Sequence, residues 1–325
     1  MARLSKPQLL DKILDGIRGG GWIPIVLEDA HPFRILASRP SRDTSNLKIY
    51  IWNCTHGGGG RSAEEFRVQF TSRPEPGQGM TTLVLGWHDD HQVFAAWDIA
   101  AHFEQDSYSP SAQIRESSLL AANRKVFSVQ PKDNEIVVAF RPEFFMDYAA
   151  ASRSLHMAGA AQRELDLLNN LEDATDAKVD AIANPARRLV VRTIMTRYRA
   201  HFFSGRVLAA YGHQCAFCRL QLGLLDAAHI VPVAAPSSTD EVTNGIALCK
   251  LHHYAYDSNL ISFNAAYAIE LSRFRLDELA TANLIGGLTA FREGLLPSIH
   301  LPARAAHHPK VAYIRESRTL RGWRQ

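Results

Sequence analysis

Cysteine, long apolar runs and net charge are all scarce in this chain of 325 residues. Its 4 cysteines are too few for a secreted scaffold held together by disulfides. No apolar run approaches the roughly 18 residues that a membrane-spanning helix needs, so the sequence predicts no membrane span. The first ten residues lack the apolar segment of a secretory signal, and we therefore expect a cytoplasmic protein.

Three of the cysteines fall in a short segment that is also rich in histidine. One pair has the spacing Cys-x2-Cys and a second pair has the spacing Cys-x2-His. Two such pairs suit one tetrahedral zinc ion, because each tight turn directs both side chains at it. The predicted zinc ligands are Cys215, Cys218, Cys249 and His252. The neighbouring His253 leaves open which of the two histidines faces the zinc, and Cys54 remains an ordinary thiol.

His229 and Asn244 lie between the two halves of this zinc motif, and a purely structural zinc module needs neither. The surrounding segments are AAHIVP (227–232), NGIALC (244–249) and LHHYAYD (251–257). Their order and spacing resemble the HNH, or ββα-metal, nuclease motif, in particular the predicted restriction endonucleases of the McrA-like kind. The resemblance covers roughly residues 200 to 275. It implies a bacterial enzyme that hydrolyses DNA.

The resemblance implies specific roles for three residues. His229 would be the general base that takes a proton from the attacking water, which suits an imidazole near neutral pH. Asn244 would orient His229 through a hydrogen bond that fixes the loop and the imidazole. An Asn-Gly turn without a catalytic role is the alternative for Asn244. His253 would bind the catalytic Mg²⁺ or Mn²⁺ ion, which stabilises charge on the phosphate and the leaving oxygen.

The second protein ligand of this catalytic ion is left open by the sequence. Many relatives carry an acid directly before the base, where this chain has Ala228. Asp226 would reach the ion only if the strand bulges. Asp257 lies four residues after His253, so on a helix both would share one face. A helix-end acid without a metal is the alternative for Asp257.

The first half of the chain favours strands. Apolar runs of strand length alternate with clusters of Gly, Pro, Asp and Ser after one amphipathic helix that begins near Ser5. The expected strands are 23–27, 33–37, 47–52, 66–70, 81–86, 93–98, 126–129 and 135–140. We therefore predict an α+β protein whose residues 1–150 form a mainly antiparallel sheet, with a barrel as one form that it can take.

Two further domains follow in this scheme. Residues 151–185 are rich in alanine and acids and indicate a helical, acidic connector that ends at Asn184-Pro185. Residues 186–325 form the predicted HNH nuclease domain, a ββα-metal fold with a zinc knuckle and a basic C-terminal tail. Residues 1–150 are then the predicted target-recognition domain.

Candidate DNA contacts come from three regions. Residues 187–206 contain six arginines and no acid, and residues 304–324 contain six Lys or Arg and one Glu. The third region surrounds the glycine run 57–60, which is either a flexible hairpin tip or a loop that approaches DNA. The candidate contacts are His56, Arg61, Arg67, Arg197, Arg199 and Arg206. Solvated basic faces are the alternative.

The sequence thus predicts a restriction-type endonuclease that cuts double-stranded DNA. Because one HNH site cuts one strand, a homodimer is expected on two-fold DNA targets. A modification-dependent enzyme is the first alternative, and an aromatic cage at Trp52, Trp87 or Trp97 would support it. Such aromatics at strand spacing more often form a core. A non-catalytic, zinc-stabilised DNA-binding protein is the second alternative.

Overall fold

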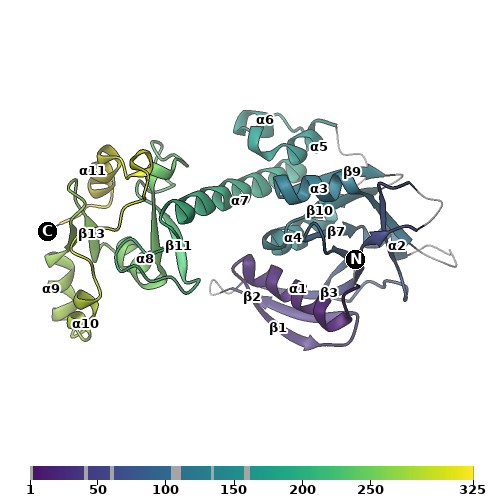
Figure 1. The fold of residues 1–325 in the computed structure, drawn as a ribbon, viewed down its shortest axis with the longest axis horizontal. Helices are drawn as coiled ribbons and strands as arrows, with labels where there is room; N and C mark the ends of the chain where they lie inside the picture. Colours follow the sequence, from purple (N-terminus) through teal and green to yellow (C-terminus); the bar gives the residue numbers. More distant parts are fainter. Residues whose placement is uncertain are drawn as a thin grey trace. The chain divides into compact units, whose positions relative to one another are not determined.

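The computed structural model describes residues 3–39, 43–58, 62–103, 111–132, 135–156 and 162–324. It divides into two compact units, Met1–Tyr198 and Arg199–Gln325, and the elements of both are labelled in Figure 1. Each unit is built around its own hydrophobic core. No helix in the described ranges is long and apolar enough to span a membrane.

The two units contain different sets of helices and strands. The first contains α1 (Lys6–Gly19), β1 (Ile23–Glu28), β2 (Phe33–Ser38), β3 (Thr44–Asn53), β4 (Thr55–His56), β5 (Glu65–Gln69), β6 (Thr81–His88), β7 (Val93–Trp97), α2 (Ile99–Phe103), β8 (Ser111–Arg115), α3 (Glu116–Lys125), β9 (Phe127–Lys132), β10 (Glu135–Phe140), η1 (Pro142–Phe144), α4 (Phe145–His156), α5 (Gln162–Asn169), η2 (Leu171–Asp173) and α6 (Asp176–Asp180). Helix α7 (Pro185–Ala210) crosses the division. The second contains β11 (Leu225–His229), η3 (Val242–Asn244), β12 (Gly245–Cys249), α8 (Lys250–Asp257), β13 (Ile261–Phe263), β14 (Ile269–Leu271), α9 (Arg273–Thr281), α10 (Leu288–Glu293), η4 (Ala305–His307) and α11 (Val311–Leu320).

An open seven-stranded sheet organises the first unit, in the order β1-β2-β3-β6-β7-β10-β9. All neighbours pair antiparallel except β3 and β6, which are parallel. The predictions of an α+β protein and of a mainly antiparallel sheet are confirmed. The barrel form is wrong, because β1 and β9 do not pair with each other and remain the edge strands of this sheet.

The two faces of this sheet belong to different cores because strand side chains alternate. On β3, Ile49 and Ile51 enter the core covered by α1, α4 and α5, whereas Tyr50 and Trp52 enter the opposite one. That second core is covered by α3 and by the three-stranded sheet β4-β5-β8. A sheet covered on both faces has its apolar surface buried without closing into a barrel.

The three tryptophans of the first domain do not form a cage. Trp87 is packed on one face of the large sheet, and Trp52 and Trp97 are packed on the other. All three are buried, with exposed fractions of 2%, 5% and 1% respectively. The aromatic cage that would have supported a modification reader is therefore wrong, and these rings are core residues.

Residues 151–185 differ from the predicted connector. The leucines of α5 and η2 are buried in the first core, and Glu164 of α5 makes a buried ion pair with Arg187 of α7. Asn184-Pro185 is also no boundary, since the Asn184 side chain accepts hydrogen bonds from the N–H groups of Ala186 and Arg187 as an N-cap of α7. The division falls later, after Tyr198.

Helix α7 contributes to both cores. Ile194, Met195 and Tyr198 are buried in the first, whereas Phe203 and Val207 are buried in the second. A helix supplies apolar side chains at intervals of three to four residues, so one continuous helix can serve two cores in succession. An Asn-Pro step is typical both of the start of a helix and of a domain boundary. This explains why the sequence predicts a boundary at Asn184-Pro185, where the structure has the start of α7.

The second unit contains the predicted ββα arrangement. Strands β11 and β12 pair antiparallel from Leu225↔Cys249 to His229↔Gly245, and α8 follows β12 directly. Gly245 is required here by packing, because a Cβ atom at this position would lie 2.3 Å from Val207 Cγ2. The basic C-terminal run is not a tail, since α11 packs Ile314 into the second core.

Candidate metal centre and nuclease site

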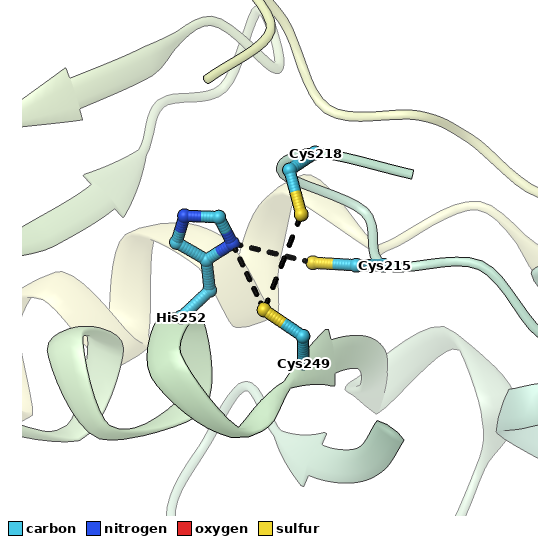
Figure 2. A group of neighbouring side chains, drawn as sticks. All are labelled: Cys215, Cys218, Cys249 and His252. Carbon is cyan, nitrogen blue, oxygen red and sulfur yellow. Dashed lines mark hydrogen bonds between the residues drawn. The ribbon is translucent and has the colours of Figure 1, made fainter. Parts of the chain in front are cut away.

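The predicted zinc ligands converge in the second unit. Cys215 and Cys218 lie in the turn before β11, Cys249 ends β12, and His252 is in the first turn of α8. Figure 2 shows the three sulfur atoms and His252 Nδ1 facing one another. These four ligand atoms lie within 4.8 Å of one another, so the cluster can hold a metal ion.

The spacing of the ligand atoms suits a tetrahedral ion. The Sγ atoms of Cys218 and Cys249 are 4.0 Å apart, and His252 Nδ1 lies 3.5 Å from Cys215 Sγ and 3.2 Å from Cys249 Sγ. Tetrahedral zinc with Zn–S bonds of about 2.3 Å places neighbouring sulfur atoms about 3.8 Å apart. His252 therefore belongs to the cysteine cluster, which leaves His253 for the other side of α8.

The thiol of Cys215 is prepared for metal binding. Burial acts to raise its pKa, but hydrogen bonds from the His252 side chain and from the backbone of Cys249, Phe217 and Cys218 outweigh burial and lower the pKa to about 6. A thiolate is the form that binds a metal. The turn is also joined to the core, because Phe217 is fully buried and Ala216 N–H donates to the Ala247 carbonyl.

His229 is the last residue of β11, as the sequence predicts. Its ring stacks on Phe203 of α7, with ring centroids 3.7 Å apart and an interplanar angle of 11°. Its Nε2 atom lies 3.0 Å from Asp240 Oδ1. An ionised carboxylate only accepts hydrogen bonds, so Nε2 carries the proton and Nδ1 is the basic nitrogen of the neutral ring. Ring stacking and this hydrogen bond together fix the imidazole.

Asn244 is fully buried, and its side chain holds the loop that follows His229. Its Oδ1 accepts from the N–H of Val231 at 2.9 Å, and its Nδ2 donates to the carbonyl of Thr239 at 2.8 Å. The amide therefore joins both ends of the loop that leads from His229 to Asp240. It fixes the loop, as the resemblance implies, whereas the imidazole itself is held by Asp240.

His253 lies between two carboxylates. Its Nδ1 is 3.1 Å from Asp226 Oδ2 and its Nε2 is 3.3 Å from Asp257 Oδ2. Strand β11 has no bulge at Asp226, so the condition under which Asp226 would reach the ion is not met. Asp226 reaches His253 from the regular strand because α8 folds back onto β11. The two carboxylates occupy opposite edges of the ring, so they do not converge on one point.

Each of these carboxylates also has a cationic partner. Lys250 Nζ contacts both oxygens of Asp226, at 2.6 and 2.8 Å. The hydrogen bond from His253, with that from Lys250, holds the pKa of Asp226 below its usual value. Arg321 donates to Asp257 Oδ1 at 3.1 Å and to the carbonyl of His229 at 3.4 Å. Arg321 therefore links the strand end that bears His229 to the helix end that bears Asp257.

Several of the predicted DNA contacts have partners within the protein, and two others line a pocket. Arg197 pairs with Asp147 in the first unit, and Arg206 donates to the carbonyl of Asp240 in the second. Arg199 has a partner as well. Arg61 lies outside the described residues. His56 and Arg67 line one pocket of the first unit.

Three residues of the site were missed by the sequence reasoning. Asp240, Arg321 and Phe203 all contact either His229 or its backbone. Asp240 lies in a polar loop without periodicity, and Arg321 is 92 positions from His229. The basic run that contains Arg321 was noticed for its charge, but nothing in it indicates which arginine reaches the site.

Comparisons with known proteins place this site in a class. Residues 215–264 match the family model described as HNH endonuclease, and residues 45–149 match the one described as methylase-associated X1. No curated protein matches the chain. A solved "Modification dependent TagI restriction endonuclease" is 12% identical over 85% of this chain and 81% of that chain, with a TM-score of 0.29. This score is too low for a common fold to follow.

The fold and the site thus define a ββα-metal nuclease domain in the second unit. The chain contains an HNH endonuclease domain, as the resemblance predicts, and it is a nuclease. Its first unit contains a methylase-associated X1 domain.

Proposed function

We propose that this protein is a restriction-type endonuclease that hydrolyses phosphodiester bonds of double-stranded DNA. The observation that carries the proposal is His229, held by Asp240 and Phe203 at the end of β11 within the segment that matches HNH endonucleases. A binding module has no need for an imidazole restrained in this way. The first unit, in this proposal, selects the target and the second unit cuts it.

His229 Nδ1 takes a proton from water, and the hydroxide attacks the phosphorus in line with the leaving 3′ oxygen. The P–O3′ bond breaks as the new P–O bond forms, and the leaving 3′ oxygen takes a proton from solvent water, which leaves a 5′ phosphate and a 3′ hydroxyl. Asp240 holds the proton on Nε2, so that Nδ1 is free to act as the base. Asn244 keeps the loop between His229 and Asp240 in place.

The donor sets support two ions of different kinds. Three thiolates and an imidazole suit structural Zn²⁺, bound by Cys215, Cys218, Cys249 and His252. At the second site, His253 Nε2 and Asp257 Oδ2 are 3.3 Å apart, close to the roughly 3.0 Å between neighbouring ligands of Mg²⁺. When bound, Mg²⁺ or Mn²⁺ would stabilise charge on the phosphate and the leaving oxygen.

Asp226 then has a supporting role in this second site. Its carboxylate accepts from His253 Nδ1, which fixes the ring with Nε2 directed at Asp257. Lys250 contacts both oxygens of Asp226, whereas Arg321 contacts only Oδ1 of Asp257 and leaves Oδ2 beside His253 Nε2. Among the candidates from the sequence, we therefore propose His253 and Asp257 as ligands and Asp226 as the residue that orients His253.

A modification-dependent enzyme is the second candidate. The observation that favours it is the match of residues 45–149 to a family described as methylase-associated. Such an enzyme would cut only methylated or otherwise modified DNA. In either case, one HNH site cuts one strand, so we propose that a homodimer makes the double-strand break.

The test is digestion of paired plasmids, one unmodified and one carrying methylated cytosine or adenine, with added Mg²⁺ or Mn²⁺. Discrete fragments from the unmodified plasmid support the first candidate. Cutting confined to the modified plasmid supports the second. DNA binding without cleavage of either plasmid under any of these conditions would overturn the nuclease proposal in favour of a zinc-stabilised binding protein.

Replacing Asp240 by alanine is expected to lower kcat by roughly 10- to 100-fold, part of the contribution of a positioned general base, with little change in KM. The reason is that His229 loses the acceptor for its Nε2 proton. Asp240→Asn keeps an acceptor oxygen and should retain more activity. Steady-state cleavage of a labelled duplex gives both constants.

The matched control for this prediction is the neighbouring acid. Glu241 contacts Lys310 instead of His229, so Glu241→Ala should cleave DNA like the wild-type protein. If Asp240→Ala cleaves DNA as fast as Glu241→Ala, or faster than the wild type, Asp240 does not orient the base.

A further inference from the structure

The small sheet of the first unit has one buried face and one polar face. On β5, Phe66 and Val68 enter the core, so Arg67 and Gln69 point to the opposite face. The neighbouring strand β4 pairs Thr55 with Arg67. The outer face of the β4-β5-β8 sheet therefore presents polar side chains next to the end of β3.

A pocket of about 200 Å³ lies beside this polar face. Arg3 and Arg67 both line it, together with Thr55, Gln69 and the edge of Trp52. Thus side chains from the start of the chain, the end of β3 and both strands of the β4-β5 pair meet at one hollow.

The charges of this pocket are unbalanced. No Asp or Glu lines it, and within the described ranges neither Arg3 nor Arg67 has an ion-pair partner. Several other arginines of this unit do pair with a carboxylate, as Arg34 does with Glu28. Two guanidinium groups without counter-charge at one hollow favour an anion, and a phosphate fits the hydrogen-bond geometry of arginine.

The described rings beside this pocket do not form a cage for a flipped base. Trp52 is only 5% exposed and contacts Tyr50 and Phe70, and its indole N–H donates to Thr71 Oγ1. His56 is exposed, but its two ring nitrogens are used within the turn, since Nδ1 accepts from the Gly58 N–H and Nε2 contacts the Ser62 carbonyl. One exposed ring cannot sandwich a base, so the pocket suits the backbone of DNA more than a flipped base.

We propose that Arg3 and Arg67 bind a backbone phosphate of DNA, so that the outer face of the β4-β5-β8 sheet is a DNA-contacting surface of the first unit. This inference rests on the proposed function, in which the first unit contacts the target. It assigns Arg67 a phosphate contact that positions the protein without reading sequence, adds Arg3, and gives His56 a role in shaping the turn.

The test is the salt dependence of DNA binding. Arg67→Gln and Arg3→Gln are each combined with His229→Gln, which prevents cleavage, and fluorescence anisotropy is measured on a labelled duplex from roughly 50 to 200 mM KCl. Loss of this phosphate contact in the variant that carries both substitutions should reduce the slope of log K against log [KCl] by about 0.9, and each single substitution should give part of that reduction. The weakening should be equal on a cleavable duplex and on an unrelated one.

Two controls keep the result interpretable. Arg67→Lys keeps the charge and should retain the slope, which separates charge from folding. Arg34→Gln removes an arginine that Glu28 already neutralises, so it should leave the slope unchanged. If Arg67→Gln and Arg3→Gln match Arg34→Gln while the wild type still binds and cuts DNA, the phosphate site is overturned and the nuclease proposal stands. If the wild type neither binds nor cuts DNA, the proposed function itself fails.

Discussion

Replacing His229 by glutamine is expected to lower kcat for DNA cleavage by about 10²- to 10⁴-fold, the contribution of a positioned general base. A carboxamide nitrogen cannot accept the proton of the attacking water. DNA affinity should be unchanged, because the loss lies in the chemical step. Single-turnover cleavage of a labelled duplex, with binding measured in parallel, checks both parts of this prediction.

Glutamine is preferred to alanine because His229 also contributes packing. Its ring stacks on Phe203, and its side chain is only 14% exposed, so His229→Ala would leave a gap beside α7. His307→Gln is the matched control, since His307 lies in η4 of the same unit and makes no side-chain hydrogen bond within the described part of the chain. Cleavage by His229→Gln at the rate of His307→Gln would show that another group is the base.

Replacing Cys249 by serine is expected to remove a bound zinc ion and to unfold the second unit. Binding of structural zinc contributes about 10–16 kcal/mol in small zinc domains, which matches or exceeds the roughly 5–15 kcal/mol that stabilises a typical domain. Cys249 lies in the second core beside Cys215, so an empty cluster also weakens packing around β12. Metal analysis should find about one zinc per wild-type chain and none in the variant.

The thermal transition separates this effect from a general loss of stability. The second unit of Cys249→Ser should lose its transition and its nuclease activity, whereas the first unit, which has its own core, should still unfold cooperatively. Cys54→Ala is the control, because Cys54 is buried in the first unit far from the cluster in sequence. A Cys249→Ser protein that keeps one zinc and its melting profile would contradict the assignment.

Much of the second unit follows from the sequence because its signals are local. The Cys-x2-Cys and Cys-x2-His pairs specify tight turns, and the Asn244-Gly245 step marks the turn from which β12 begins. The spacing therefore predicts a set of metal ligands, and the resemblance to HNH nucleases predicts a ββα frame; the structure contains this frame and a cluster that could hold a metal ion. In the first unit, apolar alternation likewise predicts eight strands that the structure contains.

Strands without apolar runs were not predictable in this way. Strands β4 and β8 are absent from the sequence expectations, since they are short and half polar. Both pair with β5, and β8 buries Ala112 and Ile114 in the second core. The sequence pattern also did not predict that residues 151–185 contribute to the first core. Alanine and acids suggest a solvated connector, and only the position of the large sheet turns the leucines of α5 into core residues.

The sequence by itself indicated the chemistry that we propose: the thiols that can hold a metal follow from their spacing, and the imidazole proposed as the base follows from the resemblance to HNH nucleases. Both rest on residue types at short spacing along the chain. Tertiary structure alone decided which side chains lie next to these groups. It assigned His252 to the thiols and His253 to the carboxylates, and it brought Asp240 and Arg321 to His229. Such contacts join residues from distant parts of the chain, and their positions depend on how whole elements pack, which no local pattern contains.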